Sequence, residues 1–108
     1  MVRSVFVLTI LFFTASRVVA ADVDGKAVYA KHCTNCHGED GHGQTPAGKA
    51  LKTVSLVDPQ WATPDALPKI EGAVRDGVPR MPAMKAKLSP EEIAAVARYV
   101  QQLAGVKP

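Results

Sequence analysis

The sequence predicts an all-α domain, in which a first and a last helix are joined by short middle helices. The segment from Ser89 onward carries a complete set of helix signals, and no run of alternating β-branched residues indicates a strand. Beyond the N-terminal segment, the only aromatic side chains are Tyr29, Trp61 and Tyr99. A chain this short with so few large side chains builds a small core. We therefore expect something other than side chains to fill part of the interior.

The N-terminal segment resembles a secretory signal peptide. An apolar run, Val5–Phe13, precedes small residues suited to cleavage, and Arg17 interrupts any extension of the run. The run is shorter than the roughly 20 apolar residues that a membrane-spanning helix needs. We therefore predict that residues 1–20 are a cleaved signal, with an uncleaved membrane anchor as the alternative.

Cleavage after Ala20 or Ala21 would leave a single exported domain, residues 21–108, with no stable membrane insertion. The removed segment contains Arg3 and Arg17 and no acidic residue, so the formal net charge falls from +3 to +1. This small charge gives no reason to expect a nucleic-acid partner.

The first helix is predicted over Asp22–His32, with Asp22 or Asp24 as its N-cap. Gly25, Tyr29 and Cys33 lie four residues apart and therefore share one face. Because glycine lowers helix propensity, Gly25 indicates that another backbone approaches this face closely.

The run Cys33-Thr34-Asn35-Cys36-His37 is a C-x-x-C-H motif, which is typical of a c-type haem attachment site. Two thiols at this spacing can form thioethers with one porphyrin, and the following histidine can bind its iron. A disulfide across two residues would close too small a loop to stabilise much. A thioredoxin-like pair is expected beside a βαβ pattern, and a zinc site needs a second pair of ligands. The motif therefore predicts Cys33 and Cys36 as haem-binding residues and His37 as an iron ligand.

The middle of the chain gives weaker signals. A glycine-rich loop, 38–46, precedes a helical turn over Ala47–Lys52, and 53–61 shows no period. His32 and His42 are expected to be surface residues.

A middle helix is predicted to start at Thr63-Pro64 and to stop at Gly77. Since Pro68 and Gly72 both weaken helices, we expect it to be short, kinked or split.

The last helix has the strongest signals in the chain. Ser89 is its N-cap, Pro90 takes the first position, and Glu92 completes a capping box. Leu88 and Ile93 are placed as a hydrophobic staple. The apolar stripe consists of Ile93, Val96, Ala97, Val100, Leu103 and Ala104, and Gly105 ends it.

Two methionines lie between the middle and last helices, in the segment Arg80–Lys85. Pro82 constrains the backbone beside Met81, so the thioether of Met81 can be held in one place. A soft sulfur is a suitable sixth ligand of haem iron, and His/Met ligation raises the reduction potential. We prefer Met81 as the second metal ligand and expect Met84 to fill the wall beneath it.

These features together resemble a class I cytochrome c of the short, soluble, bacterial monohaem type, over essentially all of residues 21–108. The matching pieces are the Gly25/Tyr29/Cys33 face, the C-T-N-C-H motif, the glycines of the following loop, and M-P-A-M before a capped last helix. The resemblance implies one haem c, bound covalently through two thioethers, as the centre of the core.

The resemblance also implies several contacts. The first and last helices should cross at Gly25 and Tyr99. The carbonyl of Pro46 should accept the ring N–H of the haem histidine, and Trp61 should lie near the haem propionates. Met81, which precedes a proline, matches the axial ligand of the family, whereas Met84 stands where many relatives have Phe or Tyr.

The expected function is that of a periplasmic electron carrier rather than an enzyme, since both axial positions of the iron would be filled by protein. Its partners would be redox proteins that bind transiently. Two alternatives remain open: a haem-based sensor from which Met81 dissociates, and a haem subunit of a larger oxidoreductase. A set of basic residues is a candidate docking ring at the haem edge: Lys49, Lys52, Arg80, Lys85 and Lys87.

Overall fold

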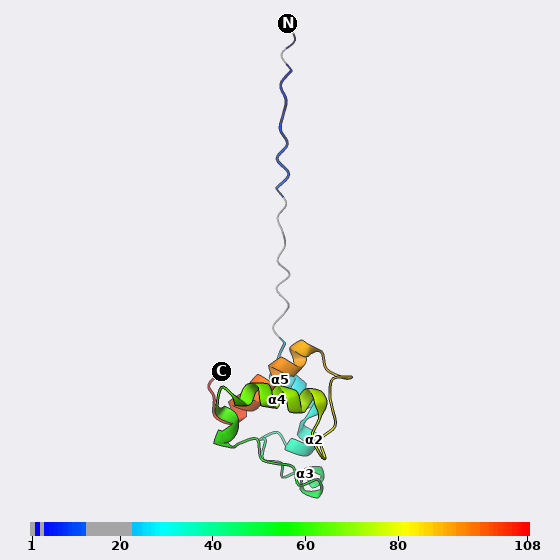
Figure 1. The fold of residues 1–108 in the computed structure, drawn as a ribbon, viewed down its shortest axis with the longest axis vertical. Coiled ribbons are helices and arrows are strands. Elements are labelled where there is room, and N and C mark those ends of the chain that lie inside the picture. Colours follow the sequence, from blue (N-terminus) through cyan, green and yellow to red (C-terminus); the bar gives the residue numbers. More distant parts are fainter. Residues whose placement is uncertain (1, 3, 13–22) are drawn as a thin grey trace.

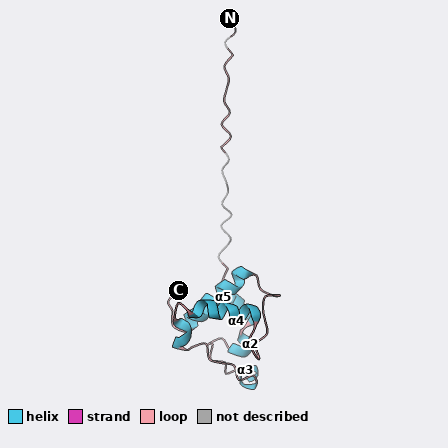
Figure 2. Ribbon diagram, viewed as in Figure 1, coloured by secondary structure: helices cyan, strands magenta, loops and turns pink. Residues whose placement is uncertain are grey.

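The structure is a computed structural model that describes residues 2, 4–12 and 23–108. Its helices are α1 (Gly25–His32), α2 (Thr34–His37), α3 (Pro46–Ala50), the 3-10 helix η1 (Pro59–Ala62), α4 (Ala66–Asp76) and α5 (Pro90–Leu103). Within the described ranges there is no β-strand, only one isolated bridge between Val78 and Met81 (Figure 2). The all-α prediction is confirmed.

Residues 4–12 lie in no helix or strand, and no helix of the described residues is long and apolar enough to cross a membrane. The predicted cleavage sites, Ala20 and Ala21, lie outside the described residues, as does Asp22.

The first and last helices pack against each other, as the resemblance implied. A Cβ atom on Gly25 would collide with the backbone carbonyl of Ala95, and it would come within 3.2 Å of Cβ of Tyr99. Next to this contact, the rings of Tyr29 and Tyr99 lie 5.1 Å apart with an interplanar angle of 58°. Glycine at position 25 therefore lets the α1 and α5 backbones meet.

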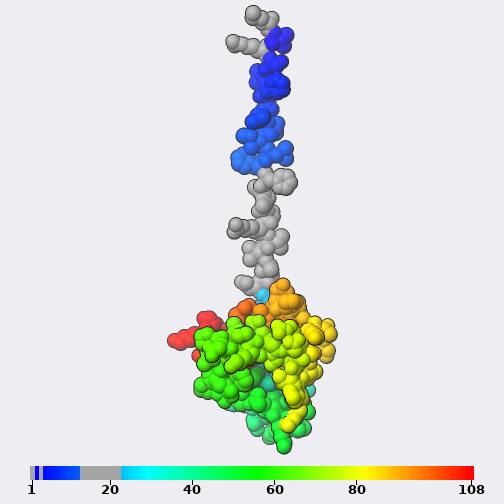
Figure 3. Space-filling view, in the orientation of Figure 1, coloured from blue at the N-terminus to red at the C-terminus, as the bar shows by residue number. Residues whose placement is uncertain are grey.

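Helix α4 packs on α5 and forms the other side of the core (Figure 1). Its buried face consists of Ala66, Ile70 and Val74, which meet the buried stripe of α5. The loop after α4 follows it on the surface, where the yellow and yellow-green atoms adjoin (Figure 3). The core side chains are Val28, Tyr29, Leu56, Ala66, Ile70, Val74, Met84, Leu88, Ile93, Val96, Ala97 and Val100.

The helix ends follow the predicted signals in part. Asp24 caps α1 by accepting hydrogen bonds from Lys26 and Ala27, and Ser89 and Glu92 form the complete capping box of α5. Gly77 ends α4 with a φ of 77°.

Of the three alternatives predicted for the middle helix, short, kinked or split, the structure excludes a split helix. Helix α4 is one continuous helix of 11 residues. Pro68 falls in its first turn, where a missing N–H removes no intrahelical hydrogen bond. The helix also begins at Ala66, later than the predicted start at Thr63-Pro64.

Candidate haem-binding site

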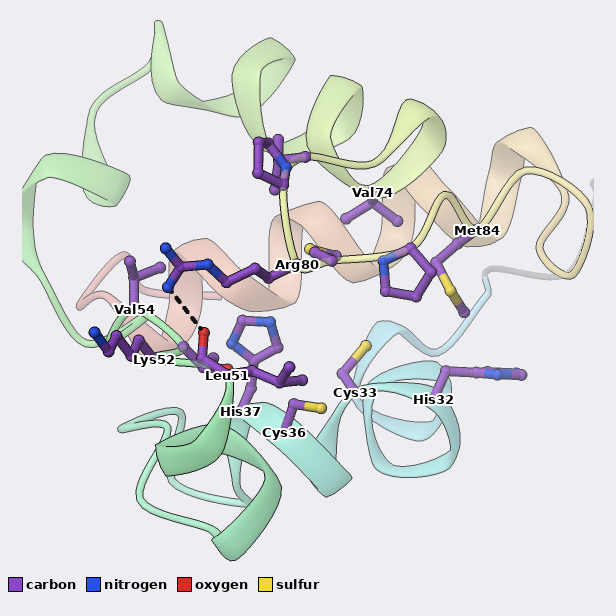
Figure 4. Close-up of a pocket in the computed structure, with 15 residues that line it drawn as sticks. His32, Cys33, Cys36, His37, Leu51, Lys52, Val54, Val74, Arg80 and Met84 are labelled. Carbon is purple, nitrogen blue, oxygen red and sulfur yellow. Dashed lines mark hydrogen bonds between the residues drawn. The ribbon is translucent and has the colours of Figure 1, made fainter.

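The motif segment spans the junction of α1 and α2. Cys33 ends α1 and begins α2, and its carbonyl accepts a hydrogen bond of 2.9 Å from the amide of His37. This turn places the Cys33 and Cys36 thiols and the His37 imidazole on one cavity (Figure 4). The two thiols are not bonded to each other. The motif residues are therefore arranged for a common ligand.

Helix α3 supports this segment from behind. The Thr45 hydroxyl caps α3 and lies 2.7 Å from the carbonyl oxygen of Asn35 and 3.0 Å from that of Cys36. A Cβ atom on Gly48 would collide with the carbonyl oxygens of Cys36 and Gly43. Close backbone packing thus fixes α2 against α3.

Tyr29 supports the motif from the core side. Its side chain is only 2% exposed, and its hydroxyl donates a hydrogen bond of 2.6 Å to the carbonyl of Gly38, the residue that ends α2. Burial is the main cause of the raised pKa of Tyr29, so the hydroxyl stays protonated and can donate.

Two adjoining cavities, of about 370 and about 330 Å³, lie above the motif. The residues that line both of them are Cys33, His37, Val54, Val74, Val78 and Met81. Trp61 and Ile70 line only the smaller cavity, which we call the inner cavity. Lys52 and Arg80 line only the larger one, which we call the outer cavity. The shared walls are mainly apolar, which suits a large flat apolar ligand.

The two methionines take different places around these cavities. Met81 lines both, whereas Met84 lines only the outer one and belongs to the buried core with 9% exposure. Met81 therefore shares both cavities with His37, whereas Met84 shares only one.

Burial shifts the pKa values of two motif side chains, His37 and Cys33. It lowers the pKa of His37, against an opposing effect of the Val54 backbone, and so favours the neutral imidazole that binds metals. Burial, with a smaller effect of Cys36, raises the pKa of Cys33 to about 11.

Two buried ring nitrogens at this site lack a hydrogen-bond partner: Nδ1 of His37 and Nε1 of Trp61. The expected bond from His37 to the carbonyl of Pro46 is therefore not formed, and Pro46 instead begins α3. Trp61 lines the inner cavity, so its unpaired indole N–H is a candidate donor to a ligand bound there.

The residues of this site match the chemistry of a covalently attached haem. Two thiols, one neutral imidazole and one thioether line the apolar space, and Trp61, whose indole N–H has no partner, lines its inner part. Sequence analysis did not assign Val54, Val74 and Val78 to this space, because they come from three separate segments and no local pattern joins them.

Comparison with known proteins agrees with this chemistry. Residues 20–100 match the family model described as "Cytochrome C oxidase, cbb3-type, subunit III". The chain belongs to this family of cytochrome c domains. Among curated relatives, cytochrome c6 of Nostoc sp. is 36% identical over 101 residues, which cover 90% of this chain and 87% of the relative.

A second kind of relative is larger than this cytochrome. The cbb3-type cytochrome c oxidase subunit CcoP of Azospirillum brasilense is 32% identical over 82% of this chain, which covers only 30% of that subunit. Among solved structures, the KustC0563 c-type cytochrome superposes with a TM-score of 0.67 and 33% identity, over 75% of this chain and 98% of the other. The predicted class I cytochrome c fold is confirmed by these matches.

Proposed function

We propose that this protein is a periplasmic electron carrier with one haem c, attached through Cys33 and Cys36 and ligated by His37 and Met81. The observation that carries the proposal is that Cys33, His37 and Met81 line the same two apolar cavities. The similarity to cytochrome c6 over most of both chains supports a role in electron transfer. Residues 1–20, with their signal-like pattern, support export.

When bound, the haem would supply a one-electron couple whose potential depends on its axial ligands and on its burial. The protein's own residues would do the rest. The two cysteines would fix the orientation of the group, and His37 and Met81 would fill both axial positions. The three valines would exclude water, and the indole N–H of Trp61 would donate to a propionate.

Attachment is tested by the alkaline-pyridine spectrum of the purified holoprotein, which distinguishes thioether-bound haem from free haem. Replacing Cys33 and Cys36 together by Ala should abolish attachment and leave a chain without cooperative unfolding, since the two cavities would be empty. A double variant that melts cooperatively without haem would show that the cofactor is not structural.

Ligation is tested by a matched pair of variants. The oxidised protein should show the weak red-edge absorption of a sulfur–iron bond. Met81→Ala should abolish this band, whereas Met84→Ala should keep it and lower stability by about 2–5 kcal/mol, as for a core methionine. The opposite pattern would assign ligation to Met84.

A second candidate function is that of a haem subunit in a larger oxidoreductase. The observation that favours it is the match to the subunit III family and to part of CcoP. Size-exclusion chromatography of the native extract, followed at the haem absorbance, separates the two candidates. A haem band at the mass of the free domain supports the carrier, and one in a large complex supports the subunit.

A further inference from the structure

The residue before Met81 has an unusual backbone conformation. Val78 and Met81 are joined by two backbone hydrogen bonds, of 3.1 and 2.9 Å, which close a tight turn with Pro79 and Arg80 at its centre. Arg80 has a φ of 71°. A turn with proline second and a positive φ third normally takes glycine at the third position, because a side chain there is unfavourable. An arginine at this position calls for a compensating role.

The side chain of Arg80 lines the outer cavity and reaches Leu51 on another part of its wall. Its Nη1 donates a hydrogen bond of 3.4 Å to the carbonyl of Leu51, drawn as the dashed line in Figure 4. Leu51 is the C-cap of α3, so its carbonyl has no partner within the helix and carries part of the negative end of the helix. The partners are 29 residues apart in sequence, and the bond therefore joins two different walls of the site.

The two walls are the segment 33–57, which contains His37, and the loop 78–88, which contains Met81, and each is held by its own contacts. On the histidine side, α3 is fixed to α2 through Gly48 and Thr45. On the methionine side, the amide of Met84 donates to the carbonyl of Val74 at 2.8 Å, and the backbone of Met81 packs on Gly77. Among the hydrogen bonds of residues 23–108, the one from Arg80 alone joins the loop 78–88 to the segment 33–57.

We propose that Arg80 is a positioning residue, whose bond to Leu51 holds Met81 at the cavity and limits how readily this ligand leaves the iron. The proposal rests on the proposed ligation by Met81. An external ligand can bind the iron only in the fraction of molecules in which Met81 has left. If a variant loses stabilising free energy in the state with Met81 bound, the equilibrium constant for Met81 dissociation rises by the corresponding factor. The fraction of molecules open to an external ligand rises with it.

The test is a titration of the oxidised holoprotein with imidazole at about pH 8, where the free ligand is mostly uncharged. Binding is followed by loss of the red-edge sulfur–iron band. Arg80→Ala keeps the Cβ atom, and with it the same backbone cost, but removes the donor. We expect imidazole to bind about threefold to tenfold more tightly, the factor that corresponds to one net hydrogen bond.

Two further variants complete the design. Arg80→Lys keeps a donor and the charge, and it should recover at least half of the difference in affinity on a logarithmic scale. Arg98→Ala removes an exposed arginine from α5 and should bind imidazole as the wild type does.

An imidazole affinity of Arg80→Ala within twofold of the wild type would overturn the proposal, and so would an equal gain in Arg98→Ala. A wild-type protein without the sulfur–iron band would overturn the Met81 ligation, and the role of Arg80 with it.

Discussion

Gly25→Ala should destabilise the protein, although alanine is the better helix former. The new Cβ atom would overlap the carbonyl of Ala95, and this backbone atom cannot move aside without shifting α5. Such overpacking costs about 1–3 kcal/mol in a well-packed core. The gain in helix propensity is at most about 1 kcal/mol, and less at the first position of α1.

The free energy of unfolding should therefore fall by about 1–2 kcal/mol. In a domain of this size, each kcal/mol lost lowers Tm by about 4–8 °C. Structurally, the two helices would have to separate, and the 5.1 Å contact between the Tyr29 and Tyr99 rings would loosen.

The matched control is Gly72→Ala, within α4. The nearest atom to a Cβ built there is Nη2 of Arg75, at 3.8 Å, so the site has room for a methyl group. This variant should gain about 0.5–1 kcal/mol from helix propensity. Guanidinium chloride unfolding of both holoproteins, followed by far-UV circular dichroism, gives the comparison. If Gly25→Ala proves as stable as Gly72→Ala, the close contact of α1 and α5 is not a constraint on the fold.

Tyr29→Phe should lower the free energy of unfolding by about 0.5–1.5 kcal/mol, since it removes one of the two hydrogen bonds to the buried carbonyl of Gly38, which also accepts from the amide of Gly41; a thermal melt unchanged within error would contradict this. Ser89→Ala should cost about 1 kcal/mol by removing the cap of α5, measured in the same way. The hydrogen bond from the backbone N–H of Ser89 is the main cause of the lowered pKa of Glu92. The ionised Glu92 should therefore stabilise the fold fully above the ordinary pKa of a glutamate, and this stabilisation should be lost as the pH falls through the lowered pKa. A pH-stability profile unchanged in Glu92→Gln would refute this. If the basic ring guides partner docking, electron transfer to the native partner should slow as salt rises, and Lys52→Glu should slow it further; a rate indifferent to salt would point to apolar docking.

The sequence predicted best the parts whose signals are local. The last helix carries its cap, its capping box and its apolar stripe within one short segment, and each of these is present in α5. The contact at Gly25 was likewise predictable, because glycine lowers helix propensity and this cost suggested that another backbone comes close.

The parts that depend on distant partners were not predictable. Helix η1 has no period of its own, and its end is held by the side chain of Gln101, which donates to the carbonyls of Trp61 and Thr63 at 3.2 and 2.8 Å. The positive φ of Arg80 left no signal, since arginine does not mark such turns. The roles of Cys33, Cys36, His37 and Met81 remain predictions, which the arrangement of the cavities supports.

The packing of α1 chiefly on α5 has a consequence for the order in which the protein matures. A chain made from its N-terminus presents Cys33 and Cys36 long before Pro90, the first residue of α5, exists. An isolated helix of eight residues is unstable in water, so α1 gains its structure only when its partner arrives. Both thiols therefore stay accessible while the rest of the chain is made, and the last element to appear closes the site in which they lie.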